Sequence, residues 1–235
     1  MRPVNKDNPP KDSKNQEITF KKYQHARRYL IDTIGEYCSY CERKIVVGLA
    51  VEHIEPKSII KNKHLELKWS NFLLACTNCN STKWATNIVL SDYFWADYDN
   101  TYAIFSYDAS GIVKVSSQIT APQEIQRAIN TIKLVGLDKK PPKTNTIAWK
   151  DASDRRFEHR IQAFKDSVEQ AKNYSLAPLE ARNYMLPLIT IVVLGDGFWS
   201  IWMRAFENFP EVQKELINAF TGTRKEFFED IINNS

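Results

Sequence analysis

All four cysteines of the chain fall within one short stretch, where they form two C-x-x-C pairs. Cys38 and Cys41 make the first pair, Cys76 and Cys79 make the second, and 34 residues separate the two pairs. Four thiolates are enough to close a tetrahedral zinc site that leaves no open position for a substrate. The spacing therefore predicts a structural zinc ion, and the alternative is four buried cysteines without a metal.

The composition is that of an ordinary globular protein. Hydrophobic side chains make up 43% of the 235 residues, and only 7 residues are glycine, so a glycine-rich linker or phosphate-binding loop is not expected. Residues 1–16 lack the apolar stretch of a secretory signal, and the apolar run over residues 185–194 is too short to span a bilayer. We therefore expect a cytoplasmic protein without membrane contact, in which paired cysteines bind metal rather than form disulfides.

The net charge of +4 is unevenly distributed. Residues 1–30 hold eight Lys or Arg against three Asp or Glu, and residues 138–165 hold eight against four. Residues 205–235 hold three against six. The basic segments are compatible with binding to phosphates, but a solvated surface is the commoner explanation of such charge. Charge alone does not establish a nucleic-acid partner.

Local patterns predict an α+β protein that is mainly α. In the first third, apolar spacing indicates a helix over residues 18–34. Residues 37–47 are expected to lead from the first cysteine pair into a strand that turns back into a second strand over residues 50–54. Residues 56–68 have the pattern of a loop, and residues 80–85 are expected to open a short helix.

The later sequence predicts a hairpin followed by helices. Apolar runs between residues 102 and 116 flank a turn, and Thr120 begins a capping-box pattern for a helix that ends at Gly136. Residues 139–143 mark a break. A narrow apolar stripe comes next, at Phe157, Ile161, Phe164, Val168 and Ala171, and further helices are expected at about 179–194, 198–208, 211–221 and 223–232.

A carboxylate and an imidazole stand side by side between the cysteine pairs. Glu52 and His53 lie at the end of the second expected strand, where neighbouring side chains point to opposite faces unless the chain bends. Asn71 follows His53 by eighteen residues, and Asn80 follows Asn71 by nine. A lone histidine is more often structural than reactive, but its position between the cysteine pairs makes this group a candidate site.

The ordered motifs C-x-x-C, E-H-I-x-P-K, W-x-N-x-L-L-A-C and x-x-C-N-x-x-K resemble the HNH endonucleases of the ββα-metal type. More narrowly, they are similar to HNH proteins of bacterial anti-phage defence, namely the retron-associated HNH proteins and the PtuB component of Septu systems. The motifs cover about 50 of the 235 residues. The resemblance implies a ββα-metal core with Cys₄ zinc knuckles inside a larger helical protein.

The resemblance also implies a role for each candidate residue. His53 matches the general base, and Glu52 and Asn80 match the positions that hold a catalytic divalent cation, Mg²⁺ or a similar ion. Asn71 matches the asparagine that orients the base and braces the loop, and Lys83 matches a basic position near the scissile phosphate. Asn80 replaces the histidine of the family's third letter and offers only a neutral oxygen, so phosphate oxygens and water complete the coordination, as suits Mg²⁺.

On this basis the chain divides into a flexible N-terminal arm (1–16), an HNH nuclease domain with its N-terminal helix and following hairpin (17–137), and a helical region (138–235) that is a candidate for partner docking. Septu-like HNH proteins act with an ATPase, PtuA, and retron versions add a reverse transcriptase with its RNA–DNA hybrid. The chain has no phosphate-binding loop, so an ATPase activity has to belong to another chain.

The expected function is therefore metal-dependent hydrolysis of nucleic-acid phosphodiester bonds, as the toxic effector of an anti-phage system. One alternative is a non-catalytic zinc ribbon that binds nucleic acid or protein, which would not need Glu52, His53 and Asn80. A scaffold with a decayed site is a third possibility, and the intact triad argues against it. The sequence does not separate DNA from RNA, and Trp69 and Trp84 are expected to pack the domain rather than to stack on bases.

Overall fold

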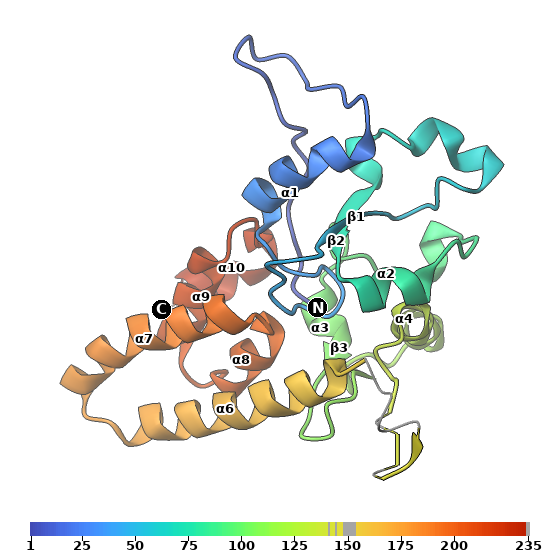
Figure 1. Cartoon of the computed structure of the whole chain (residues 1–235). Helices are drawn as coiled ribbons and strands as arrows, with labels where there is room; N and C mark the ends of the chain where they lie inside the picture. The colour runs from blue at the N-terminus through green and yellow to red at the C-terminus, as the bar shows by residue number, and fades with distance from the viewer. Residues whose placement is uncertain (141, 144, 148–153, 234–235) are drawn as a thin grey trace.

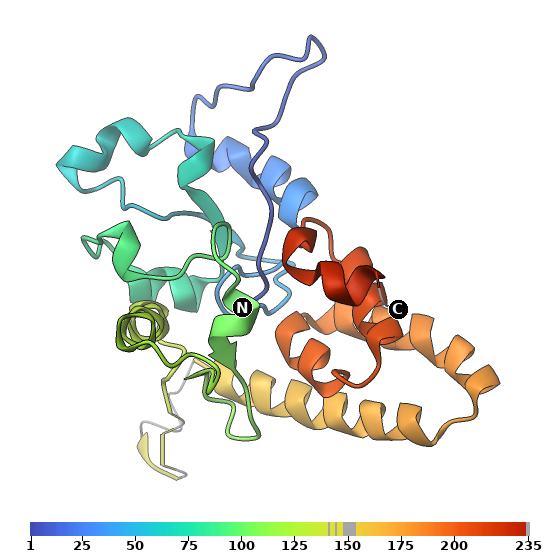
Figure 2. The same cartoon turned by 180° about the vertical axis from the view of Figure 1, so that it is seen from behind.

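Two groups of elements lie side by side, one around the cysteine pairs and one made of the helices after residue 155 (Figures 1 and 2). The computed structural model describes residues 1–140, 142–143, 145–147 and 154–233. Among these residues both two-stranded sheets lie in the first group, and helix is far commoner than strand. This arrangement confirms the α+β, mainly α fold class.

The first group is built on a two-stranded antiparallel sheet. Strand β1 (Ala50–His53) pairs with β2 (Phe72–Ala75), with Glu52 opposite Leu73 and His53 opposite Phe72. Helices α1 (Ala26–Ile34) and α2 (Thr77–Lys83) pack against this sheet. Short 3₁₀ helices lie at Tyr23–His25, Ile60–Leu65, Trp69–Asn71 and Leu90–Asp92.

The prediction of a hairpin between residues 37–47 and 50–54 is wrong. Residues 37–47, all of which the structure describes, form only isolated bridges, of Tyr37 with Lys44 and of Arg43 with Gly197. β1 pairs instead with β2, whose four residues are all buried and apolar. An apolar strand such as β2 gains free energy when both of its faces are buried, whereas the polar segment 37–47 would lose hydration there. β1 therefore pairs with β2, which follows the loop after residue 54.

The hairpin expected between residues 102 and 116 is present but shorter. Helix α3 (Thr101–Ile104) takes up its first residues, and only β3 (Phe105–Ser106) and β4 (Lys114–Val115) pair. Helix α4 (Pro122–Val135) follows and ends at Gly136, which adopts the left-handed conformation that glycine favours. Thr120 does not cap this helix, because Ala121 occupies the N-cap position without a side-chain bond.

The second group begins with a long antiparallel helix pair. α6 (Arg156–Leu176) and α7 (Leu179–Asp196) extend away from the first group, and the shorter helices α8 (Trp199–Ala205), α9 (Pro210–Ala219) and α10 (Glu229–Asn233) pack beside them (Figure 1). Trp199, Trp202 and Leu216 are fully enclosed in this second core. Among the described residues no helix has both the length and the apolarity needed to cross a bilayer.

The buried face of α6 differs from the expected stripe. Val168 is 47% exposed, whereas Arg156 and Arg160 are buried. Arg160 donates to the backbone oxygens of Gly111 and Leu137, so its charge is hydrogen-bonded inside the protein. The break expected at residues 139–143 includes residue 141, which lies outside the described residues.

The first six residues belong to the core, so the expected loose arm over residues 1–16 is wrong for them. The Met1 ammonium is fully buried and lies 3.0 Å from the Glu42 carboxylate. Arg2 donates to the backbone oxygens of Ile34 and Thr221, and Val4 bridges to Thr223. These contacts join the start of the chain to both groups of elements.

Candidate active site

The four cysteines meet in one buried cluster. Their sulfur atoms all lie within 4.8 Å of one another, and all four cysteines are free thiols. The Sγ atoms of Cys41 and Cys76 are 3.8 Å apart, which equals the edge, about 3.8 Å, of a tetrahedron with Zn–S bonds of about 2.3 Å. The donor set and its spacing therefore fit a tetrahedral metal ion with four sulfur ligands.

The local chain places each cysteine pair on a tight turn. In the first pair, Glu42 follows Cys41 with a positive φ of 64°, which turns the chain back beneath the sulfurs. In the second, Cys76 is the N-cap of α2, and its sulfur accepts a hydrogen bond from the Cys79 amide. Hydrogen bonds from the neighbouring thiols lower the pKa of Cys76, whereas burial raises the pKa of Cys38.

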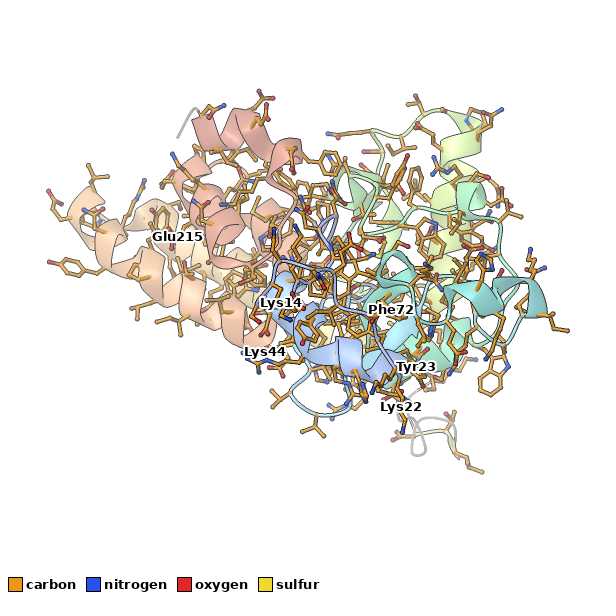
Figure 3. All side chains as sticks on the ribbon, turned by 90° about the horizontal axis from the view of Figure 1, so that it is seen from above. Lys14, Lys22, Tyr23, Lys44, Phe72 and Glu215 are labelled. Carbon is orange, nitrogen blue, oxygen red and sulfur yellow. The ribbon has the colours of Figure 1, made fainter. Side chains whose placement is uncertain are left out.

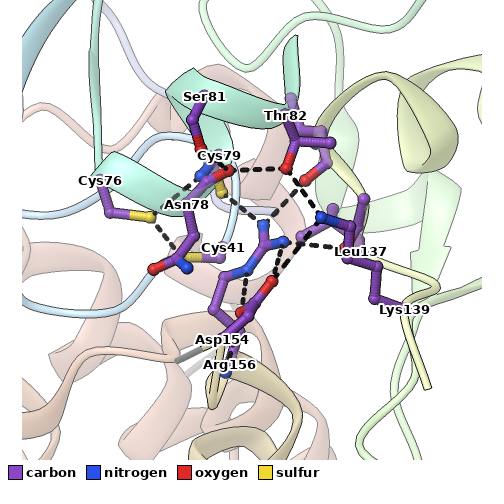
Figure 4. A network of polar contacts seen from close by, with 12 residues as sticks. Cys41, Cys76, Asn78, Cys79, Ser81, Thr82, Leu137, Lys139, Asp154 and Arg156 are labelled. Carbon is purple, nitrogen blue, oxygen red and sulfur yellow. Dashed lines mark hydrogen bonds and ion pairs between the residues drawn. The ribbon is translucent and has the colours of Figure 1, made fainter. Parts of the chain in front are cut away.

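One arginine from the second group of elements reaches this cluster. The guanidinium of Arg156 lies 3.0 Å from the Cys79 sulfur and also donates to the Val135 and Gly136 carbonyls (Figure 4). Asp154 holds the same guanidinium from the other side, at 2.7 Å. No local pattern identifies Arg156 as a partner of the cluster, because it lies 77 positions after Cys79 in the chain.

Beside the cluster, a cavity of about 550 Å³ opens at the end of β1. Glu52, His53 and Asn80 all line it, so the structure brings together three of the residues singled out from the sequence. Glu52 and His53 are the last two residues of β1, and the chain bends directly after them, at residues 54–55. The other lining residues are Tyr23, Ala50, Val51, Pro56, Lys57, Ser58, Thr77, Ser81, Trp84 and Ala85.

The imidazole of His53 is held in one orientation. Its Nε2 atom is 2.9 Å from the carbonyl oxygen of Glu66, and its ring packs against Tyr23 and Phe72 (labelled in Figure 3), with centroids 4.8 and 5.2 Å away. A carbonyl only accepts, so Nε2 carries the proton and Nδ1 keeps a free lone pair. Burial lowers the pKa of His53, so the ring is neutral near pH 7 and able to accept a proton.

Asn71 braces the loop that holds His53. Its side-chain oxygen accepts from the Glu55 amide at 2.8 Å, and its nitrogen donates to the carbonyls of Glu55 and Leu65 at 3.0 and 3.4 Å. Both ends of the 55–65 loop are thereby fixed to the start of β2. The next residue, Glu66, supplies the carbonyl that orients His53, so Asn71 acts on the imidazole through the backbone.

Lys83 lies in a different place from the one expected. It is fully buried, its Nζ atom is 2.6 Å from Glu52 Oε1, and it donates to the His53 carbonyl at 2.7 Å. A buried ammonium requires a carboxylate partner, and Glu52 provides it. Lys83 is therefore not a surface cation facing a phosphate, and its contacts make it a support for both Glu52 and His53.

Tyr40, between the first two cysteines, completes the surroundings of Glu52. Its hydroxyl donates to Glu52 Oε2 at 2.8 Å, and burial, with the nearby Glu52 carboxylate, raises the pKa of Tyr40 so that the hydroxyl keeps its proton. Each carboxylate oxygen has two lone pairs, so each oxygen of Glu52 can accept one bond beyond its contact with Lys83 or Tyr40. One carboxylate and one amide oxygen suit a hard cation that keeps water among its ligands.

The two tryptophans of the segment differ. Trp69 is buried and donates to the Lys6 carbonyl, as the packing expectation requires. Trp84 is 80% exposed at the cavity wall, so the packing expectation is wrong for it. α2 ends at Lys83, and the positive φ of 48° at Trp84 turns its side chain away from the core.

Comparison with known proteins identifies the segment that carries both sites. Residues 38–86 match the family model for HNH endonuclease. The matched segment contains both cysteine pairs and the candidate residues Glu52, His53 and Asn80 at the cavity, and it suggests a metal-dependent nuclease acting on nucleic acid. No curated protein matches the chain significantly.

Proposed function

We propose that the chain is a metal-dependent HNH endonuclease that hydrolyses phosphodiester bonds, with His53 as its general base. The observation that carries this proposal is the orientation of His53. Its Nε2 atom is tied to the Glu66 carbonyl, while its ring lines a cavity shared with Glu52 and Asn80. A neutral imidazole with a free nitrogen in a cavity beside oxygen ligands is what activation of a water molecule requires.

Each residue of the cavity has one task. Nδ1 of His53 takes the proton of the attacking water, and Asn71 keeps the loop and the imidazole in place through the Leu65 and Glu55 backbone. Glu52 and Asn80 hold the divalent cation, Mg²⁺ or a similar ion. When bound, that cation stabilises the negative charge that develops on the phosphate oxygens and on the leaving oxygen.

The cysteine cluster serves this site without taking part in the reaction. Cys38, Cys41, Cys76 and Cys79 hold zinc, and four sulfur ligands leave no position for water or substrate. Basic residues accompany the cavity: Lys57 lines it, and Lys21 and Lys22 are exposed next to Tyr23. Their charge favours a polyanionic substrate.

The decisive test compares the wild type with His53→Ala on labelled DNA and RNA in the presence of Mg²⁺. Loss of the base is expected to lower the cleavage rate by about 10²- to 10⁴-fold, while the zinc content stays close to wild type. A non-catalytic zinc ribbon, the alternative, predicts no cleavage by either protein. Equal cleavage by both proteins would rule out His53 as the base.

The biological setting belongs to the same proposal. The motifs resemble the HNH proteins of retron and Septu defence, which supports a cytoplasmic, toxic effector that acts with a PtuA-like ATPase and, in a retron, with a reverse transcriptase and its RNA–DNA hybrid. Helix α7 offers a docking surface, because Tyr184, Leu188 and Ile191 are exposed along it. Co-purification with the product of a neighbouring ATPase gene tests this, and Leu188→Glu is expected to abolish it without lowering stability.

A further inference from the structure

Trp84 combines three features that packing does not explain. Its indole is 80% exposed, it lines the cavity that contains His53, and its backbone adopts φ 48° and ψ −141°. Side chains rarely adopt such a positive φ, and residues held in this way cluster at ligand-binding positions. A large apolar side chain kept in water at the wall of a reactive cavity indicates contact with a ligand.

The position of Trp84 is fixed relative to the proposed cation ligand. The Trp84 amide donates to the Asn80 carbonyl at 2.9 Å, so the two residues stand one helical turn apart at the end of α2. Four residues of helix span about 6 Å. A phosphate bound at Asn80 therefore places the adjoining nucleotide, and not a distant one, next to the indole.

We propose that Trp84 is a stacking surface for an unpaired nucleobase beside the scissile phosphate, so that the substrate is single-stranded or locally unpaired nucleic acid. This inference rests on the proposed function and specifies its substrate class. Stacking on an indole requires a free base face, which a paired and stacked base in a duplex does not offer. Trp84 would stack on a base of any identity, since every base has such a face.

The surroundings favour a nucleotide over another apolar ligand. The cavity of about 550 Å³ is large enough for one nucleotide. Lys57 lines the same cavity and stands 3.9 Å above the Tyr23 ring, and Lys21 and Lys22 are exposed beside it. Positive charge with an exposed aromatic face is the combination that binds single strands.

Binding measurements in the His53→Ala background separate stacking from cleavage. The probes are a labelled oligothymidylate, an oligouridylate, a chain of abasic deoxyribose phosphates of equal length, and a fully paired duplex. Trp84→Ala is expected to weaken binding of the two base-bearing single strands by about 5- to 150-fold. Binding of the abasic chain and of the duplex stays unchanged, because both contribute phosphates without a free base.

Two further variants exclude a structural explanation. Trp84→Gly removes the ring but suits the positive φ, so it should match or exceed the thermal stability of wild type while binding single strands as weakly as Trp84→Ala. Tyr98→Ala is the matched control, because Tyr98 is equally exposed, at 80%, but lines a different cavity. It should leave the binding of every probe unchanged.

The outcomes separate this inference from the proposed function. If the wild type cuts nucleic acid but Trp84→Ala weakens all four probes equally, or none, the stacking role is wrong and the nuclease proposal stands. If the wild type with His53 intact neither binds nor cuts any probe, the proposed function fails and the inference fails with it.

Discussion

The cysteine cluster and the His53 cavity are neighbours within residues 38–86, yet they are built in opposite ways. The four cysteines are fully enclosed and offer four equivalent soft ligands, whereas the cavity is open and lined by one carboxylate, one amide and one imidazole. α2 serves both: Cys76 is its N-cap, Cys79 lies in its first turn, and its last turn carries Asn80 and Lys83. A site that holds the fold is closed and saturated, and a site that reacts needs free ligand positions.

The two sites are also connected by direct contacts. Tyr40 extends from the first cysteine pair to Glu52, and Lys83 extends from α2 to the same carboxylate. Substituting these residues one at a time shows how strongly the cavity around His53 depends on the cysteine cluster for its stability and its cation binding. The expected loss in the free energy of unfolding is largest for a sulfur ligand and smallest for the single hydrogen bond of Tyr40.

Removing one sulfur ligand should have the largest effect. A structural zinc contributes on the order of 10 kcal/mol of folding free energy, comparable with the whole stability of a domain. Cys76→Ser is therefore expected to give an unfolded chain without zinc, measured by circular dichroism and metal analysis. Asn78→Ser, between the second pair of cysteines, is the control. This variant should remain folded and should still bind zinc. A folded, zinc-free Cys76→Ser protein would contradict the structural role.

Lys83→Met should have the next largest effect. It leaves the Glu52 carboxylate buried at 2% exposure without its counter-charge, and breaking a buried pair costs about 3 to 5 kcal/mol. Urea denaturation measures this loss. The double variant Glu52→Gln with Lys83→Met should recover most of the stability, because no unpaired charge remains. If the single and double variants are equally destabilised, the pair is not what holds this region together.

Arg156→Ala tests the contact between α6 and the cluster. The variant loses charge-assisted hydrogen bonds to the Cys79 sulfur and to two carbonyls, which is expected to lower the free energy of unfolding by about 3 kcal/mol. Zinc should also pass faster to a chromogenic chelator. Arg155→Ala is the neighbouring control, because Arg155 is exposed and forms an ion pair with Glu158 at the surface, away from the cluster. Equal rates of zinc release from both variants would show that Arg156 does not stabilise the zinc-binding cluster.

Tyr40→Phe is expected to lower the free energy of unfolding least of the four variants. Its main effect should be weaker binding of the divalent cation at Glu52. One hydrogen bond to a carboxylate is lost, worth about 1.5 kcal/mol, and the zinc should remain. Glu52 loses one of its two supports, so Mn²⁺ binding, followed by electron paramagnetic resonance, should weaken several-fold. Tyr29→Phe, on the exposed side of α1, is the control. Unchanged Mn²⁺ affinity in Tyr40→Phe would show that the two sites are independent.

The sequence predicted those features that depend on short spacing. The two cysteine pairs identify their own cluster, because a C-x-x-C turn brings its two sulfurs together in most local contexts. Apolar spacing and a closing glycine likewise predicted α4, which ends at Gly136 as expected. Glu52, His53 and Asn80 do line one cavity, while their chemical roles remain predictions.

Features that depend on distant partners were not predicted. The partner of β1 lies beyond a loop, and the burial of Lys83 on α2 depends on its ion pair with Glu52 on β1. Trp69 and Trp84 are the same residue type, yet Trp69 is buried and Trp84 is exposed. Trp84 follows the end of α2 and has a positive φ of 48°, which local sequence patterns did not predict. Arg156 and Arg160 occupy interior positions because carbonyls of other segments accept their hydrogen bonds.

The pairing of residues 3–5 with residues 222–224 has a consequence for the order in which this protein forms. The Asn5 amide donates to the Gly222 carbonyl and the Arg224 amide to the Pro3 carbonyl, while Lys6 reaches the Trp69 and Ser70 carbonyls before β2. Closing a loop of such length is slow compared with local helix formation. The pairing of these two segments is therefore expected to form late in folding, after the local helices and the β1–β2 sheet that lie between them in the chain.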